Sequence, residues 1–330
     1  MDGAATKLRL DFHPRDSRGL IWGYRLDDLV PLSIDQSLDS DSGPTWYHFN
    51  IADGRARKWL EEQSGMPAHA VEMMLEPHPR VRLNVMPQGL VGVLVDLHHD
   101  FKGDPEGFGE LRFFVDGVRV ISARRHPLKS VDDLHRNLHQ LPTMKTTGDW
   151  VEALVALLTH NFAESVRALI DRTDTLEDEV VGGRSTHVQR SELASIRRLL
   201  VRFRRHVHAD RQALQRVRLE GREKRHADAN RVSIEQLEAV VQDMELVHER
   251  VRLLQEEVSN LLAEATNRNL YVLSIVTTAL LPATLITGIW GMNVGGLPWK
   301  DDVHGIVWAG LSLLLSIIFS LVLLRRTRVL

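Results

Sequence analysis

Two long apolar stretches near the C-terminal end dominate the hydrophobic pattern of this 330-residue chain. The first, Leu270–Trp290, contains no charged side chain, and the second, Ile306–Leu324, follows after a connecting loop. As helices, these runs of 21 and 19 residues rise roughly 30 Å, which matches the hydrocarbon thickness of a bilayer. The pattern therefore predicts two membrane-spanning helices.

The segment before the first span predicts one long helix. No proline or glycine interrupts the chain between Ser233 and Pro282, so we expect one helix of about 60 residues and ~85 Å that continues through the span. Apolar residues recur along it at steps of three and four, the spacing of a coiled-coil seam. They are Ile234, Leu237, Val241, Met244, Val247, Val251, Leu254, Val258 and Leu261. We expect this stalk to bundle with copies of itself.

The N-terminal part of the chain predicts a mixed α/β fold. Alternating or β-rich runs occur at Gly19–Leu26, Trp46–Ile51, Arg80–Val85, Leu90–Leu97, Leu111–Val115 and Val118–Ala123, and an Asp-Gly turn joins the last two. Asp53 is expected to cap a helix that runs to Gln63, and a second helix is expected at Pro67–Leu75. Ser130 with Asp133 resembles a capping arrangement for a segment that ends at Leu141.

After Pro142 the pattern becomes wholly helical, with helices expected at Asp149–Val181 and Gln189–Glu220. A turn from Gly221 to Asn230 would follow, with Ser233 as the next cap. The expected fold is an α+β domain, a long stalk helix and two C-terminal transmembrane helices. The expected divisions are an α/β domain (1–141), a helical domain with the stalk (142–266), a first span (267–293), an outer loop (294–305), a second span (306–324) and a basic tail (325–330).

The basic residues near the spans predict their orientation. Arg268 precedes the first span and Arg325, Arg326 and Arg328 follow the second, whereas the connecting loop contains only Lys300 among Lys and Arg. Because Lys and Arg stay on the cytoplasmic side, both termini are expected in the cytoplasm.

Charge is also distributed unevenly over the helical region. The segment from Arg197 to Arg225 is strongly basic and that from Asp228 to Glu264 is acidic. A basic helix running back along an acidic one, within or between subunits, would explain this, and so would two solvated faces. The net charge of −3 offers no electrostatic basis for binding nucleic acid.

One face of the first span is polar. The three-four spacing continues through Asn267, Leu270, Ser274, Thr277, Leu281, Thr284, Gly288 and Gly291, while most other positions are large and apolar. If several copies met along this stripe, it would line a pore. The alternative is that these small residues only allow helices to pack closely.

At the end of this stripe stands Gly291-Met292-Asn293. This tripeptide, at the outer end of the first of two C-terminal spans, resembles the signature of the CorA-type divalent-cation transporters. The following Val294-Gly295-Gly296-Leu297-Pro298 is similar to the ZntB zinc-transporter branch, whereas magnesium-type members usually continue with Met-Pro-Glu-Leu.

The resemblance implies a funnel-shaped homopentamer in the bacterial inner membrane. It identifies Gly291, Met292 and Asn293 as the selectivity filter and Asn267, Leu273, Leu281 and Thr284 as pore constrictions. A ring of Asn293 carboxamides would bind the ion through its hydration water, since neutral oxygens hold it less tightly than carboxylates.

Other polar residues carry weaker hypotheses. Asp301, Asp302 and His304 in the outer loop would attract cations to the mouth of the pore, and a solvated loop is the alternative. Glu256 on the stalk is a candidate for a cytoplasmic metal site.

Together these features favour zinc uptake through a central pore, with no cofactor and with a proton-linked mechanism left open. The inward-negative potential contributes about 4.6 kcal/mol per divalent ion at 100 mV, so no further energy source is required. The alternatives are a magnesium or cobalt channel, with Ni²⁺ and Cd²⁺ as further cargo ions, and a membrane-anchored scaffold that transports nothing. No constellation of nucleophile, base and orienting group indicates an enzyme.

Overall fold

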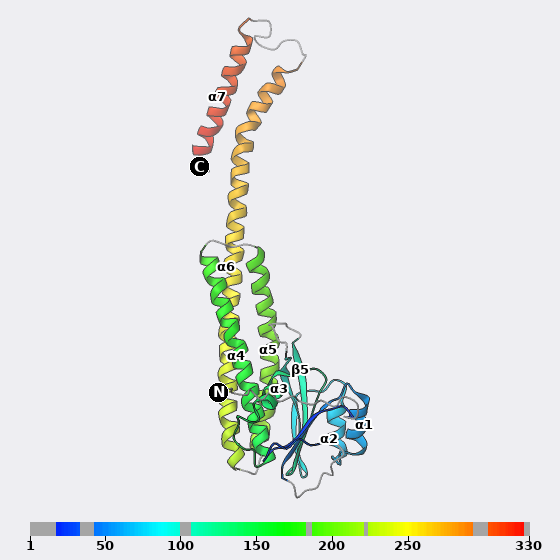
Figure 1. The fold of residues 1–330 in the computed structure, drawn as a ribbon. Coiled ribbons are helices and arrows are strands. Elements are labelled where there is room, and N and C mark those ends of the chain that lie inside the picture. Colours follow the sequence, from blue (N-terminus) through cyan, green and yellow to red (C-terminus); the bar gives the residue numbers. More distant parts are fainter. Residues whose placement is uncertain are drawn as a thin grey trace, which may run out of the picture. The chain divides into compact units, whose positions relative to one another are not determined.

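The computed structural model describes residues 18–33, 43–99, 107–182, 187–220, 224–292 and 303–326. They form two units, Met1–Leu254 and Gln255–Leu330. The first contains the sheet and most of the long helices, and the second contains the apolar part of the last long helix together with the C-terminal helix (Figure 1).

The sheet has six strands in the order β1-β2-β6-β5-β4-β3. Only β2 and β6 are parallel, and every other neighbouring pair is antiparallel. The strands are β1 (Leu20–Arg25), β2 (Thr45–Asn50), β3 (Arg82–Met86), β4 (Gly89–Leu97), β5 (Phe108–Val115) and β6 (Arg119–Arg124). All six strand predictions are confirmed, as is the Asp-Gly turn, where Asp116 Oδ1 accepts from the amides of Val118 and Arg119.

Helices cover both faces of this sheet (Figure 1). On one face lie α1 (Gly54–Glu62) and α2 (Ala68–Leu75), whose Trp59 and Met73 belong to one apolar core with strand residues such as Phe114. On the other lie α3 (Lys129–Asn137) and the first half of α4 (Thr147–Val181). The α4 residue Trp150 lies 5.5 Å from Trp46 of β2, between ring centroids.

The predicted cap of α1 is confirmed, and that of α3 is wrong. Asp53 caps α1 as expected, because its Oδ1 accepts from the amide of Arg55. The Ser130–Asp133 cap is wrong: α3 begins after Leu128, which makes no side-chain cap. Instead Asp96 of β4 accepts hydrogen bonds from Ser130, so a neighbouring strand supplies the cap. The helix also ends at Asn137, before the expected Leu141.

The long helix α6 runs from Lys224 to Trp290, which confirms one helix from the stalk through the first apolar stretch. The predicted turn from Gly221 to Asn230 is wrong from Lys224 onward, and residues 221–223 lie outside the described residues. The segment after Gly221 is polar but contains no proline or further glycine, so nothing in it stops a helix. Ser233 is therefore a buried position inside α6, not its cap.

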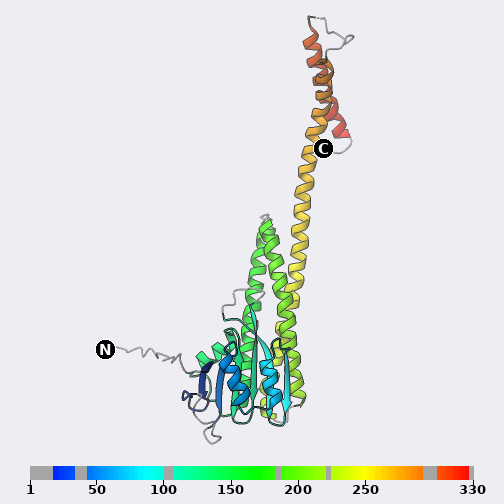
Figure 2. The same cartoon turned by 90° about the vertical axis from the view of Figure 1, so that its right-hand side faces the viewer.

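The expected bundling of the stalk seam with copies of itself is also wrong for the first unit. Residues such as Met244 and Val251 are buried within the chain, because α4 and α5 (His187–Glu220) pack beside α6 (Figure 2). Arg250 of α6 reaches Asp174 and Glu177 of α4, at 2.7 Å each. A three-four seam does not distinguish a partner helix in the same chain from one in another copy.

The pairing of the basic helix with the acidic one is confirmed within one chain. Arg211 of α5 donates to Glu238 of α6 at 3.2 Å, and Arg204 lies 3.9 Å from Glu245. Because the helices are antiparallel neighbours, residues later in α5 meet residues earlier in α6.

Two described helices are long and apolar enough to cross a membrane by length and composition. In α4 the most apolar window has a mean hydropathy of 1.2 and is 44% buried, so α4 is a core helix. In α6 the window has a mean hydropathy of 2.0 and none of it is buried. The C-terminal helix α7 (Gly305–Arg326) carries a shorter apolar stretch, Gly305–Ser320.

We expect Val251→Ala to lower the free energy of unfolding by about 2 kcal/mol, because it empties a buried site between helices. The same substitution at the half-exposed Val201 of α5 is expected to change it by less than about 0.5 kcal/mol. Denaturation in detergent, followed by tryptophan fluorescence, measures both. Equal effects would contradict an intramolecular seam.

Candidate functional site

The apolar part of α6 has two different faces within the second unit. The least exposed positions recur at three- and four-residue steps along one side of the helix. They are Ile275, Ala279, Pro282, Ala283, Ile286 and Trp290. Helix α7 has a matching stripe of mostly small residues, namely Ala309, Ser312, Leu313, Ser316, Ile317 and Ser320. Since α7 runs beside this part of α6 in Figures 1 and 2, we infer that these two stripes face each other.

The opposite side of α6 carries the predicted pore residues. At about 100° per residue, the predicted stripe centres roughly half a turn from the covered one. All of its members are exposed in the single chain: Asn267, Leu270, Leu273, Ser274, Thr277, Leu281, Thr284, Gly288 and Gly291. The alternative was that these small residues allow close helix packing. Helix α7 is not the helix that packs on them, because its own small residues face the other side of α6.

The hydroxyl groups on the uncovered face have a defined orientation. Thr277 Oγ1 donates to the carbonyl of Leu273 at 2.8 Å, and Thr284 Oγ1 donates to that of Leu280 at 2.9 Å. Each hydroxyl hydrogen is thus used within the helix, and the oxygen lone pairs remain as acceptors on the surface. Gly288 adds open space, since nothing lies within 4 Å of a Cβ built there.

The span ends at Trp290, and Gly291 and Met292 form a turn in which their amides donate to the carbonyls of Thr287 and Ile289. Gly291 does not have the positive φ of a left-handed helix end. A Cβ there would approach the carbonyl oxygen of Thr287 to 3.1 Å, so the close turn itself favours glycine.

The remaining predicted residues are only partly described. Asn293, Asp301 and Asp302 lie outside the described residues. His304 is exposed, and its carbonyl accepts from the amides of Val307 and Trp308 at the start of α7. Glu256 is exposed on α6. In the described part of the chain no group of three or more His, Cys, Asp or Glu could hold a metal ion.

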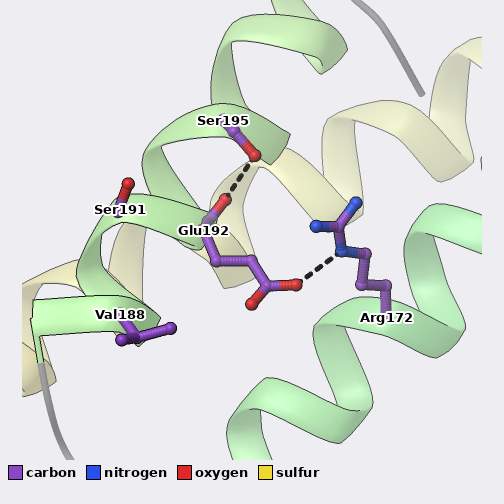
Figure 3. Close-up of a pocket in the computed structure, with 5 residues that line it drawn as sticks. All are labelled: Arg172, Val188, Ser191, Glu192 and Ser195. Atoms are coloured by element: carbon purple, nitrogen blue, oxygen red, sulfur yellow. Dashed lines mark hydrogen bonds and ion pairs between the residues drawn. The ribbon is translucent and has the colours of Figure 1, made fainter. Parts of the chain in front are cut away.

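The first unit has an open surface pocket between α4 and α5, lined by Arg172, Val188, Ser191, Glu192 and Ser195 (Figure 3). Its charged groups pair with each other, because Arg172 Nε donates to Glu192 Oε1 at 2.7 Å. Ser195 Oγ donates to the backbone carbonyl of Glu192. Nothing in this arrangement resembles a nucleophile with its base, so the uncovered face of α6 is the better candidate site.

Sequence reasoning missed the covered face. Its signal was present in the second span, where Ala309, Ser312, Ser316 and Ser320 recur at steps of three and four. Small residues at that spacing are typical of close helix packing in membranes.

Comparison with known families and proteins gives consistent results. A family model described as "CorA-like Mg2+ transporter protein" matches residues 41–326. The divalent cation transporter CmaX of Pseudomonas aeruginosa is 31% identical over 310 residues, which is 88% of this chain and 90% of that protein. The zinc transport protein ZntB of Pectobacterium atrosepticum is 25% identical over 293 residues, 87% of this chain and 89% of its own length.

Solved structures agree in fold. The structure of full-length CmaX covers 95% of this chain and 99% of its own, with a TM-score of 0.78 and 30% identity. The complete CorA magnesium transporter of Methanocaldococcus jannaschii has a TM-score of 0.77, covers 92% of this chain and 97% of its own, and is 15% identical, which supports the fold alone.

The chain has no native cysteine, so single-cysteine labelling can test the two faces directly. In liposomes, Ser274→Cys on the uncovered face is expected to react with a charged, membrane-impermeant thiol reagent, because water would reach it. Ser312→Cys on the covered stripe of α7 is the matched control and is expected to react at least tenfold more slowly. Equal reactivity at the two positions would contradict the assignment of faces.

Proposed function

The chain belongs to the CorA-like Mg2+ transporter protein family, and from this premise we propose that it takes up zinc through a pore lined by the uncovered face of α6. Family membership makes it a membrane-embedded divalent cation transporter and not an enzyme. The scaffold alternative is thereby disfavoured. The observation that carries the pore is the division of α6 into a face covered by α7 and an uncovered face of hydroxyl groups and glycine.

The uncovered face suits a hydrated ion. A divalent cation keeps its first water shell, whose oxygens point at the ion and whose hydrogens point outward. A pore wall must therefore accept hydrogen bonds. The lone pairs of Thr277 and Thr284 are available for this because each hydroxyl hydrogen is already donated within the helix. Leu281 and Leu273 alternate with them as apolar constrictions that can gate by dewetting.

At the outer end, we propose that Asn293 forms the filter ring, with Gly291 and Met292 as the turn that presents it. Carboxamide oxygens accept from hydration water and release the ion faster than carboxylates would. Asp301, Asp302 and His304 are proposed to raise the local cation concentration at the mouth, and Glu256 to contribute to a cytoplasmic site between copies.

Several copies are needed to enclose such a path. The stalk offers a second exposed stripe for this purpose: Leu246 is 65% exposed and Leu253 is 52% exposed, seven residues apart. Further steps of seven along the sequence reach Asn260, Asn267, Ser274, Leu281 and Gly288. A heptad of exposed positions that includes the pore stripe supports association around a central axis, and the family resemblance favours a homopentamer.

For the ion, we favour zinc because ZntB proteins match along most of the chain and because Val294–Pro298 is similar to their loop. Magnesium or cobalt is the second candidate, supported by the description of the family. Import into the cytoplasm follows from the membrane potential. This direction of transport requires that the protein lies in the inner membrane with both termini in the cytoplasm, as we propose. Whether transport is linked to protons is left to experiment.

Thr277→Val removes the acceptor oxygen while keeping the size of the side chain. We expect zinc flux into proteoliposomes to fall about fivefold, which corresponds to the loss of about one hydrogen bond of ~1 kcal/mol. Thr278→Val is the matched control, since the neighbouring threonine points about 100° away around the helix and should leave flux unchanged. Equal loss in both variants would contradict the proposed pore face.

Asn293→Ala is expected to abolish selective zinc influx, read with a zinc-sensitive dye inside proteoliposomes, while the oligomer remains intact by size-exclusion chromatography. Parallel assays with magnesium and with an inward proton gradient separate the alternatives. Flux of magnesium without zinc would move the protein to the second candidate, and acceleration by the gradient would establish proton linkage. Wild-type flux in the mutant would refute the filter.

A further inference from the structure

Two buried carboxyl groups that lie 114 residues apart in the sequence come together at β4, outside the proposed pore. Asp96 on β4 is 0% exposed and Asp210 on α5 is 2% exposed. Among the described residues, no Lys or Arg lies within ion-pair distance of either, although the charge of Arg124, which pairs with Asp132, also interacts with Asp96 through space. Two uncompensated buried carboxylates are costly, so a proton is expected to neutralise one of them.

Asp96 is the better stabilised of the two as an anion. Its oxygens accept from the amide and the hydroxyl of Ser130 at 2.9 and 2.7 Å, and from the amide of Leu97 at 2.7 Å. It thus caps the N-terminus of α3, where the helix dipole also favours negative charge. Burial nevertheless raises the pKa of Asp96 to about 7 against these hydrogen bonds.

Asp210 has much less support. Its Oδ1 accepts from the amide of Val95 at 3.0 Å, and its Oδ2 is buried with no hydrogen-bond partner. The pKa of Asp210 is therefore well above its ordinary value, because burial raises it most, the hydrogen bond from Val95 lowers it only in part, and the field of Asp96 raises it further. An unpartnered carboxylate oxygen in this place is far more costly than a neutral hydroxyl.

The contact that Asp210 makes is part of how α5 attaches to the sheet. The pairing of β3 with β4 ends at Val93, so the amide of Val95 lies beyond the last rung of that ladder. Asp210 supplies the acceptor that a backbone carbonyl would have supplied if β3 continued beside Val95. The next residue, Arg211, donates to Glu238 of α6, so the same turn of α5 joins the sheet to the long helix.

We propose that Asp96 and Asp210 form a proton-dependent latch that holds α5 against β4 and releases it as the cytoplasmic pH rises. With Asp210 protonated, one negative charge remains and Asp96 keeps it on the cap of α3. Loss of the proton places two negative charges in a dry site, and separation of α5 from β4 relieves their repulsion.

The other titratable groups around the site leave Asp210 without a positive partner, and the positive charge that interacts with Asp96 is that of Arg124. His206, one turn before Asp210 on α5, has its pKa lowered to about 4 by burial and by Arg205 and Arg202, so it is neutral. Asp133 of α3 accepts from Asn161, which also donates to Ser130. Arg124 of β6 is paired with Asp132 at 2.6 Å.

Infrared spectroscopy of the full-length protein in nanodiscs tests the proton directly. At pH 7.5 the wild type is expected to show the carbonyl stretch of a protonated carboxylic acid, and Asp210→Asn should lose this band. Asp243→Asn, an exposed position on α6, is the control and should keep it. Absence of the band from the wild type, or its persistence in Asp210→Asn, would overturn the proposal.

Thermal unfolding gives a second readout. A raised folded-state pKa means that the folded protein keeps a proton that the unfolded chain has lost, so stability falls as pH rises toward the folded pKa. The wild-type Tm is expected to fall by roughly 2–5 °C per pH unit between pH 6 and 8. Asp210→Asn should flatten this slope and melt higher than the wild type at pH 8. Parallel slopes would overturn the latch. Neither measurement depends on which ion is transported.

Discussion

A helix in hydrocarbon satisfies its own backbone hydrogen bonds, so only side chains can offer polar surface to an ion. The pore that we propose depends on how that constraint divides the circumference of α6. One face is covered by α7 through small residues, and the other presents hydroxyl oxygens and glycine. Because the hydroxyl hydrogens of Thr277 and Thr284 are used internally, the uncovered face is an acceptor surface without any charge. Such a surface suits an ion that keeps its water.

Within the first unit, the sheet supplies caps that the helices lack. Asp96 of β4 caps the start of α3, and Arg112 of β5 closes the end of α2 by donating to the carbonyls of Met74 and Glu76 at 2.8 and 2.7 Å. Burial lowers the pKa of Arg112 to about 10, yet leaves it protonated at neutral pH. Each buried charge thus rests at the helix end whose dipole favours it. These contacts fasten the helices to the sheet, and Asp210 does the same for α5.

Much of the architecture could be predicted because it depends on local pattern. Alternation marked all six strands, and the absence of proline and glycine after Ser233 marked the long helix. The errors arose where a partner distant in sequence decides the outcome. The cap of α3 comes from β4, and the partners of the α6 seam are α4 and α5. In each case the sequence window contains the group but not what it meets.

The candidate site shows the same division. The period of α6 placed Ser274, Thr277, Thr284 and Gly288 on one face, and the amino acids alone determine that face because the helical repeat is intrinsic to the backbone. Only the tertiary structure decided that α7 covers the opposite side (Figure 1). The burial of Asp96 with Asp210 was likewise invisible in the sequence, where the two lie 114 residues apart. Packing, and not composition, brings those carboxyl groups into one dry site.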